Sequence, residues 1–193
     1  FGKPLISGDR RPLISENKVG KSETIQNYSS LEPRVSLNVL LGNTSSLKAS
    51  YNRMTQYIHL LSNTAASSSL DVWTPSTNNI EPEIADAYVI GYFKNFKNNT
   101  YEASLELYYK DLQNQIDYID GADLLINKYI EGDLLTGIGR AYGLEFLFKK
   151  NRGRYNGWFS YTLGRSELKI DGINQYQWYP TRYDQTHNIK ITS

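Results

Sequence analysis

The sequence contains no cysteine, one methionine and two histidines among its 193 residues. Without cysteine, neither a disulfide framework nor a thiolate metal site can form. The 21 lysine and arginine residues nearly balance the 20 aspartate and glutamate residues, so the charge predicts no nucleic-acid partner. A run of about 18 apolar residues is also missing, which excludes a transmembrane helix.

Aromatic residues, by contrast, are abundant, with 16 tyrosines and three tryptophans. Rings that carry a polar tip suit the boundary between an apolar phase and water. The average hydropathy is that of a soluble protein. A membrane β-barrel also has this property, because only every second residue of its strands faces lipid.

The clearest pattern is an alternation of apolar and polar residues with a period of two. Between Tyr101 and Tyr109 the odd positions are apolar or aromatic, whereas the even positions include Glu102, Ser104 and Glu106. Nine residues in a strand span about 30 Å, which suits a tilted crossing of a bilayer. This segment therefore predicts a strand with one lipid-facing side and one hydrated side.

The same alternation recurs along the chain, and each repeat is bounded by turn residues. The segment 87–96 also predicts a strand, but both of its faces are apolar and its phase stays open. About seven strands are expected in all, near residues 35–41, 47–51, 87–96, 101–109, 142–148, 155–163 and 189–191.

The connections between these strands alternate strictly between short and long. Short turns rich in glycine and asparagine are expected at 42–45, 97–99 and 151–153, and long loops at 62–83, 120–137 and 167–181. Outer-membrane barrels alternate in this way, because short turns face the periplasm and long loops face outside. We therefore predict an all-β fold, an antiparallel transmembrane β-barrel section.

Two features predict that residues 1–193 are a section of a larger barrel. An odd number of antiparallel strands does not close neatly, and bacterial single-chain barrels have even counts. The last expected strand also ends abruptly at Ser193. The start at Phe1, on a polar segment without a signal peptide, fits either a processed chain or a fragment. We expect the plug domain and the C-terminal strands of the barrel to lie outside this chain.

Several stretches resemble the C-terminal barrel of TonB-dependent outer-membrane receptors. They include Gly139–Glu145, Arg152–Arg165 and Tyr183–Ile189, and the stretch Ser50–Leu60 resembles the Bacteroidetes-type version. Together they cover roughly residues 31–193 in the family's order. Gly164 stands where the family often has serine, a small-for-small change with no expected consequence.

This resemblance implies a 22-stranded barrel in the outer membrane of a Gram-negative cell. It also implies uptake of a scarce, bulky nutrient of the siderophore, cobalamin, oligosaccharide or peptide class. The implied partners are outer-membrane lipid, the TonB complex reached through parts absent from this chain, and a surface lipoprotein in some members.

Ligand-binding candidates lie in the expected external loops. Trp73 and Trp178 stand beside polar neighbours, and an aromatic face can stack on a sugar or a flat chelate. The alternative for both is packing of the loops or a place in the outer aromatic girdle, which is the preferred interpretation for Tyr129 and Tyr179. Tyrosines in the strands are expected to face lipid or to form the girdle (Tyr101, Tyr109, Tyr142, Tyr155 and Tyr161).

No catalytic residue, metal site or cofactor site is predicted. His59 and His187 lie on different expected strands and are assigned to ordinary barrel positions. Asp117, Asp120 and Asp123 lack the ligand set and the glycine position of an EF-hand.

Two other function classes stay open from the sequence. One is a passive porin or an adhesin with a barrel anchor. The other is a soluble carbohydrate-binding β-sandwich, in which the apolar faces would form a core instead of meeting lipid.

Overall fold

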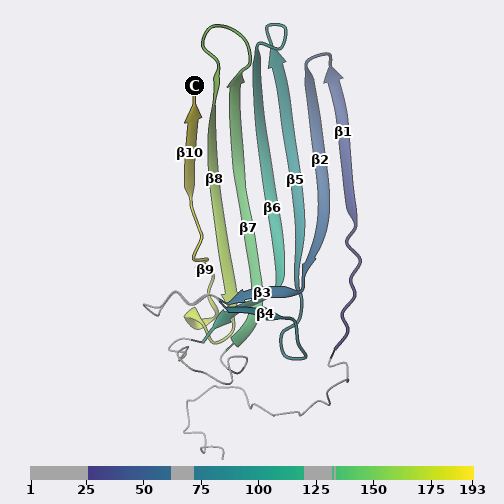
Figure 1. The fold of residues 1–193 in the computed structure, drawn as a ribbon, viewed down its shortest axis with the longest axis vertical. Coiled ribbons are helices and arrows are strands. Elements are labelled where there is room, and N and C mark those ends of the chain that lie inside the picture. Colours follow the sequence, from purple (N-terminus) through teal and green to yellow (C-terminus); the bar gives the residue numbers. More distant parts are fainter. Residues whose placement is uncertain (1–25, 62–71, 120–131, 133) are drawn as a thin grey trace, which may run out of the picture.

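The computed structural model describes residues 26–61, 72–119, 132 and 134–193. Seven strands follow one another in sequence order in a single antiparallel sheet (Figure 1). They are β1 (Arg34–Gly42), β2 (Ser45–Gln56), β5 (Glu83–Phe96), β6 (Tyr101–Tyr118), β7 (Leu134–Lys150), β8 (Gly157–Ile170) and β10 (His187–Thr192). The expected all-β antiparallel fold is confirmed, and within the described residues the sheet is open.

Four short elements lie at the end of the sheet where the long connections are (Figure 1). A separate hairpin is formed by β3 (Ile58–Leu61) and β4 (Val72–Pro75). A 3₁₀ turn, η2 (Asn174–Tyr176), precedes β9 (Tyr179–Pro180), which pairs with β8. The predicted loops 62–83 and 167–181 therefore contain some regular structure.

The turns at the opposite end have the backbone that their residues favour. Lys97, Asn98 and Asn99 have φ angles of 46°, 53° and 63°, and Gly42 and Gly153 have φ angles of 145° and 116°. Asparagine and glycine reach this left-handed region at low cost. The short–long alternation thus places the tight turns at one end, the turn end, and the long connections at the other, the loop end (Figure 1).

The strands are longer at the loop end than the alternation predicts. β6 has 18 residues and β7 has 17, against the nine expected for the first of them. A β-bulge between Leu112 and Gln115 shifts the register of β6, and Asn114 there has a φ of 57°. An extra residue breaks the period of two, so the sequence pattern ended before the strand did.

Cross-strand pairing sorts the side chains into two faces, since directly paired residues share a face. The apolar face carries a row formed by Ala49, Ile90, Leu107, Leu144 and Leu163 on successive strands. The polar face carries a neighbouring row that includes Lys48, Gly91, Glu106, Glu145 and Thr162. Pairing also fixes the phase of β5, whose Tyr88, Ile90 and Tyr92 belong to the apolar face.

The apolar face is exposed and is not the inside of a core. Leu105, Leu107 and Ile90 are each more than 40% exposed. Among the described residues no second sheet covers them, as a β-sandwich would require. No helix in the described ranges is long and apolar enough to cross a bilayer.

Candidate functional site

A row of four tyrosines borders the apolar face on the side of the loop end. Tyr51, Tyr88, Tyr109 and Tyr142 pair in turn across β2, β5, β6 and β7. The rings of Tyr51 and Tyr88 lie 5.2 Å apart between centroids. Tyrosines in such a row suit the level of the lipid headgroups, where a ring can be apolar on one side and hydrated at its tip.

A second group of aromatic side chains borders the same face near the turn end. Tyr101 stacks on Phe148 with 5.8 Å between ring centroids, and Phe146 lies 6.2 Å from Phe159. From Tyr101 to Tyr109 the strand advances about 26 Å at 3.3 Å per residue. We call the part of the face between the two aromatic groups the apolar band. Its length along the strand is that of a tilted strand crossing the hydrocarbon core of a bilayer.

The predicted lipid-facing tyrosines fall into two groups. Tyr101, Tyr109, Tyr142 and Tyr161 belong to the apolar face. Tyr155 does not, because β8 begins only at Gly157 and Tyr155 lies in the preceding turn with 75% of its surface exposed. The connection between β7 and β8 therefore spans residues 151–156 and is longer than the predicted 151–153.

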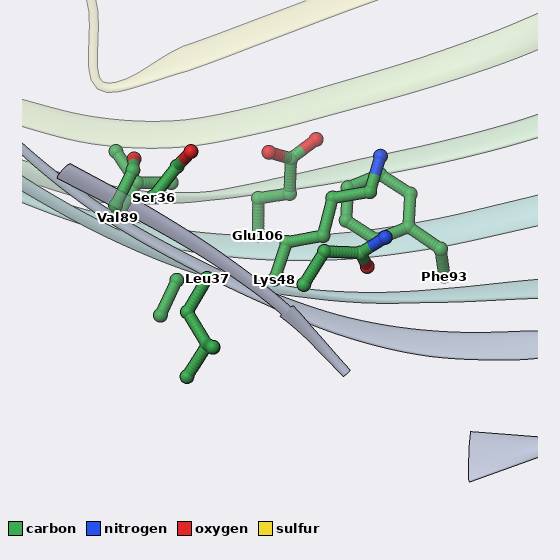
Figure 2. A pocket seen from close by; sticks show the side chains of 10 residues that line it. Ser36, Leu37, Lys48, Val89, Phe93 and Glu106 are labelled. Atoms are coloured by element: carbon green, nitrogen blue, oxygen red, sulfur yellow. The ribbon is translucent and has the colours of Figure 1, made fainter. Parts of the chain in front are cut away.

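The polar face is lined by charged and small residues. The Lys48 amine lies 4.4 Å from the centre of the Phe93 ring, beside Glu106 (Figure 2). A cavity of about 230 Å³ lies here, and its lining includes Ser36, Lys48 and Glu106. Such a surface is suited to a hydrated lumen and not to lipid.

Tyr108 lies across two neighbouring strands on the polar face. It pairs with Gly143 on β7, which pairs with Gly164 on β8. A methyl group added at Gly164 would lie 2.6 Å from the Tyr108 hydroxyl oxygen. Glycine at 164 is therefore not a neutral replacement for the serine of the resemblance, because a side chain at this position would meet the Tyr108 hydroxyl.

The hairpin at the loop end is fixed by a buried histidine. His59 in β3 is 0% exposed, and its Nε2 lies 2.9 Å from the Ser76 hydroxyl. Its Nδ1 lies 3.4 Å from the Glu83 carboxylate at the start of β5. His59 therefore belongs to the hairpin and not to the barrel sheet where the sequence placed it.

A second cavity, of about 300 Å³, lies at the loop end. Its lining includes Leu60 of the hairpin, Ile116 and Leu134 of the long strands, and Arg182. Tyr179 donates a hydrogen bond of 2.8 Å to Asp117 at the same place. Apolar walls with a few fixed polar groups are typical of a small-molecule site.

Ion pairs follow directly beyond the tyrosine row, outside the apolar band. Arg53 forms two hydrogen bonds with Asp86, of 2.8 and 2.7 Å, and the Tyr51 hydroxyl donates a third of 2.7 Å. These hydrogen bonds hold the pKa of the Asp86 carboxyl below its usual value, and the bonds from Arg53 have the largest effect.

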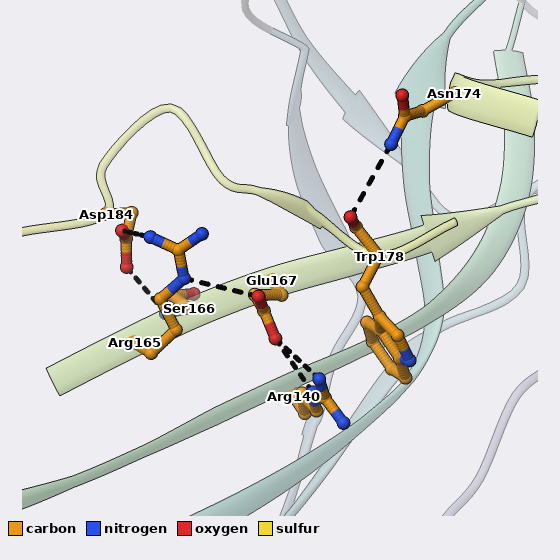
Figure 3. A network of polar contacts seen from close by, with 7 residues as sticks. All are labelled: Arg140, Arg165, Ser166, Glu167, Asn174, Trp178 and Asp184. Atoms are coloured by element: carbon orange, nitrogen blue, oxygen red, sulfur yellow. Dashed lines mark hydrogen bonds and ion pairs between the residues drawn. The ribbon is translucent and has the colours of Figure 1, made fainter. Parts of the chain in front are cut away.

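The second ion-pair network joins β7, β8 and the segment before β10 (Figure 3). Glu167 accepts hydrogen bonds from Arg140 at 2.9 Å and from Arg165 at 3.2 Å, and Arg165 also reaches Asp184 at 2.9 Å. Burial raises the pKa of Glu167, but the two guanidinium groups outweigh it and the pKa lies below its usual value. No pattern along the sequence predicts this network, because its pairs depend on the register between strands.

The structure places the two candidate tryptophans in different settings. Trp73 in β4 is 65% exposed and pairs with Leu60 across the hairpin. Trp178 is half-buried, and the Arg140 guanidinium lies 4.1 Å from the centre of its ring. No ring contact joins the two among the described residues.

The remaining loop candidates have separate outcomes. Tyr179 packs within the loop end through its bond to Asp117. Tyr129, Asp120 and Asp123 lie outside the described residues. In the part of the chain that the structure describes, no group of three or more acidic or histidine side chains is arranged to hold a metal ion.

Comparison with known proteins identifies a family for this chain. A model of the family described as TonB dependent receptor-like, beta-barrel matches residues 9–191. No curated protein and no solved structure matches the chain. The family match covers the sheet up to the last residue but one of β10, including both aromatic groups and the loop end.

Proposed function

Because the chain belongs to the TonB-dependent receptor family of outer-membrane β-barrels, we propose that it helps import a scarce, bulky nutrient. The family transports cargo across the outer membrane and is not a family of enzymes. The observation that carries the proposal is the exposed apolar band with aromatic side chains at both borders. It gives the sheet a lipid-facing surface, while the polar face forms part of a hydrated lumen.

The proposal includes a larger barrel around this sheet. β1 and β10 each pair on one side only within the described residues, so each leaves a row of backbone donors and acceptors. In lipid, unpaired backbone groups cost several kcal/mol each, so a spanning sheet needs closure. We propose that residues 1–193 are a section of a 22-stranded barrel, and that the plug and the remaining strands are supplied by other parts of the protein.

The loop end is the proposed place of cargo capture. Its cavity of about 300 Å³ combines apolar walls with the bonded pair Tyr179 and Asp117. Trp73 stands exposed on the neighbouring hairpin and is the preferred ring for stacking on cargo. These features suit an oligosaccharide, a siderophore, cobalamin or a peptide. The Bacteroidetes-type resemblance adds a surface lipoprotein as a proposed partner at this end.

The test is energised uptake by cells that carry the intact protein. Uptake of the cargo class should stop when the gene is deleted and when the proton-motive force is collapsed. Binding of cargo to the cell surface should persist after collapse, because capture at the loops precedes energised transport. Uptake that continues without the proton-motive force would favour the passive porin, and surface adhesion without uptake would favour the adhesin.

The ligand-binding role of the tryptophans has its own test. We expect Trp73→Ala to weaken cargo binding about tenfold, because loss of one stacked ring removes roughly 1–1.5 kcal/mol or more. Trp178→Ala in the same binding assay tests the second candidate. Trp158, which pairs with Lys149 and Thr192 near the turn end, provides the control, since Trp158→Ala should leave cargo affinity unchanged. Equal affinities for Trp73→Ala and the wild type would remove Trp73 from the site.

A further inference from the structure

The connection between β7 and β8 lies at the turn end (Figure 1), and three cations stand close together in it. Lys150 ends β7, and Arg152 and Arg154 follow on either side of Gly153. Gly153 has a φ of 116°, and a methyl group added to it would lie 3.5 Å from the Lys150 amine. The amine therefore lies beside the backbone that joins the two arginines. We call residues 150–155 the basic turn.

The charges of the basic turn are not balanced by the residues around it. No carboxylate in the described ranges forms an ion pair with any of its three cations. The neighbouring turn brings a further exposed cation, Lys97, and the two turns are joined by a 2.8 Å bond from the Asn151 amide to the Thr100 carbonyl. The adjacent strand ends and turns contain one acidic residue, Glu102, which lies on the polar face and pairs across the strands with Lys149 (residues 36–48, 94–102, 146–160 and 187–193).

The arginines of the sheet near the loop end have a different environment. Arg53, Arg140 and Arg165 each form an ion pair with a carboxylate of a nearby strand or segment. Cations that lie close together without a counter-charge repel one another and attract anions. The basic turn is therefore suited to an anionic partner from outside the sheet.

Tyr155 adds an aromatic ring to the basic turn. It is 75% exposed, and the central carbon of the Arg154 guanidinium lies 5.9 Å from the centre of its ring. Tyr155 precedes the first residue of β8, so it lies outside the apolar band and the aromatic group beside it. An exposed ring can stack on a sugar while a neighbouring guanidinium binds a carboxylate.

The basic turn lies on the water side of the lipid headgroups. Lys150 is two residues beyond Phe148 of the aromatic group, which is about 6.6 Å along a strand. A headgroup layer is only about 5–8 Å thick, and residues 152–155 lie beyond the end of the strand. Short turns of outer-membrane barrels face the periplasm, so the partner is expected there.

We propose that the basic turn binds peptidoglycan, the periplasmic polymer of amino sugars and carboxylate-bearing peptides. Lys150, Arg152 and Arg154 bind the carboxylates, and the Tyr155 ring stacks on a sugar. The contact attaches the periplasmic end of the receptor to the cell wall and is independent of cargo capture at the loop end.

The experiment sediments the full-length receptor, in detergent, with purified peptidoglycan and measures the bound fraction against peptidoglycan concentration. The double variant Arg152→Gln, Arg154→Gln should bind at least about tenfold more weakly, because two charge-assisted contacts are lost. Binding of the wild type should also fall when the peptidoglycan carboxylates are converted to amides. Tyr155→Ala should weaken binding without a change of charge, whereas Tyr155→Phe keeps the ring and should bind like the wild type.

The matched control is the double variant Lys110→Gln, Lys169→Gln. It removes the same amount of charge from the half of the sheet near the loop end, where neither lysine forms an ion pair within the described residues. This variant should bind peptidoglycan like the wild type. A folded-barrel mobility shift on unheated gels confirms that each variant is intact.

The proposal is overturned if the double arginine variant or Tyr155→Ala binds like the wild type, or if the control loses as much binding. It is also overturned if phosphatidylglycerol vesicles displace the peptidoglycan from the wild type, because the basic turn would then be a site for lipid headgroups.

Discussion

At the residue scale, the face on which a side chain lies determines what a substitution costs. Leu105 and Glu106 are neighbours on β6, yet Leu105 lies among exposed apolar side chains and Glu106 lines the cavity beside Lys48. The period of two in a strand places them on opposite sides of the sheet. The same substitution should therefore be costly at Leu105 and nearly neutral at Glu106.

We expect Leu105→Arg to destabilise the folded barrel by about 2–4 kcal/mol, because it places a cation near the middle of the bilayer. Urea unfolding of the full-length protein in lipid vesicles measures this loss. Glu106→Arg is the control, since the polar face is hydrated and Glu145 pairs with this position. If Leu105→Arg were neutral and Glu106→Arg costly, the assignment of the two faces would be inverted.

Gly164 provides a second test at the same scale. Gly164→Ala should cost about 1–3 kcal/mol, because the new methyl group would lie 2.6 Å from the Tyr108 hydroxyl oxygen. In a Tyr108→Phe background the nearest Tyr108 atom is the ring carbon at 3.9 Å, an ordinary contact. The cost of Gly164→Ala should then largely disappear. Equal costs in both backgrounds, measured as a double-mutant cycle, would show that Tyr108 does not lie over Gly164.

At the scale of the element, a bulge interrupts the register of β6 between Leu112 and Gln115, in the half of the strand near the loop end. Asn114 takes the left-handed backbone that the extra residue needs, and its amide donates a 3.0 Å hydrogen bond to the Pro82 carbonyl. This bond joins the bulge to the segment between the hairpin and β5. The bulge thus connects the long strand to the loops that it supports.

Two substitutions at Asn114 separate its backbone and side-chain roles. Asn114→Gly keeps the backbone accessible and loses the bond to Pro82, so we expect a loss of about 1 kcal/mol. Asn114→Val also forces a β-branched residue into the left-handed region, so its cost should be about 1–2 kcal/mol larger. The measurement is the free energy of unfolding of the two variants, which should be lower for Asn114→Val than for Asn114→Gly. Equal stability of both would mean that the residue does not hold a positive φ in the folded protein.

Prediction from sequence succeeded and failed in different parts of the same element. Alternation between Tyr101 and Tyr109 gave the correct strand and the correct faces, because period two is a local property. Alternation could not reveal the rest of β6, because the bulge inserts a residue and breaks the period of two. The residues from 110 to 118 are also mostly polar, so they contain no alternating pattern to recognise. The hairpin of β3 and β4 was missed for another reason, since its strands pair across an intervening segment of sequence.

At the scale of the whole molecule, the two outer strands of the sheet depend on what lies beside them. In the proposed full barrel β1 and β10 have neighbours on both sides. Their amide hydrogens should then exchange with deuterium as slowly as those of β6 in the full-length receptor, since paired amides exchange only on opening. Exchange near the rate of an unpaired strand in β1 and β10 would show that the sheet edges stay open and would contradict the larger barrel.

The sequence by itself determined the seven strands of the main sheet, the positions of their short turns and, in most strands, which residues share a face, because these follow from the order of neighbouring residues. It left a soluble sandwich open, and the open sheet together with the family match decided for the outer membrane. Only the tertiary structure decided which residues from different strands stand at the same height. The alignment of Tyr51, Tyr88, Tyr109 and Tyr142, the ion pairs of Glu167 and the place of Trp178 on Arg140 all depend on register between strands. Register is set by pairing across the sheet, and a pattern along one strand does not contain it.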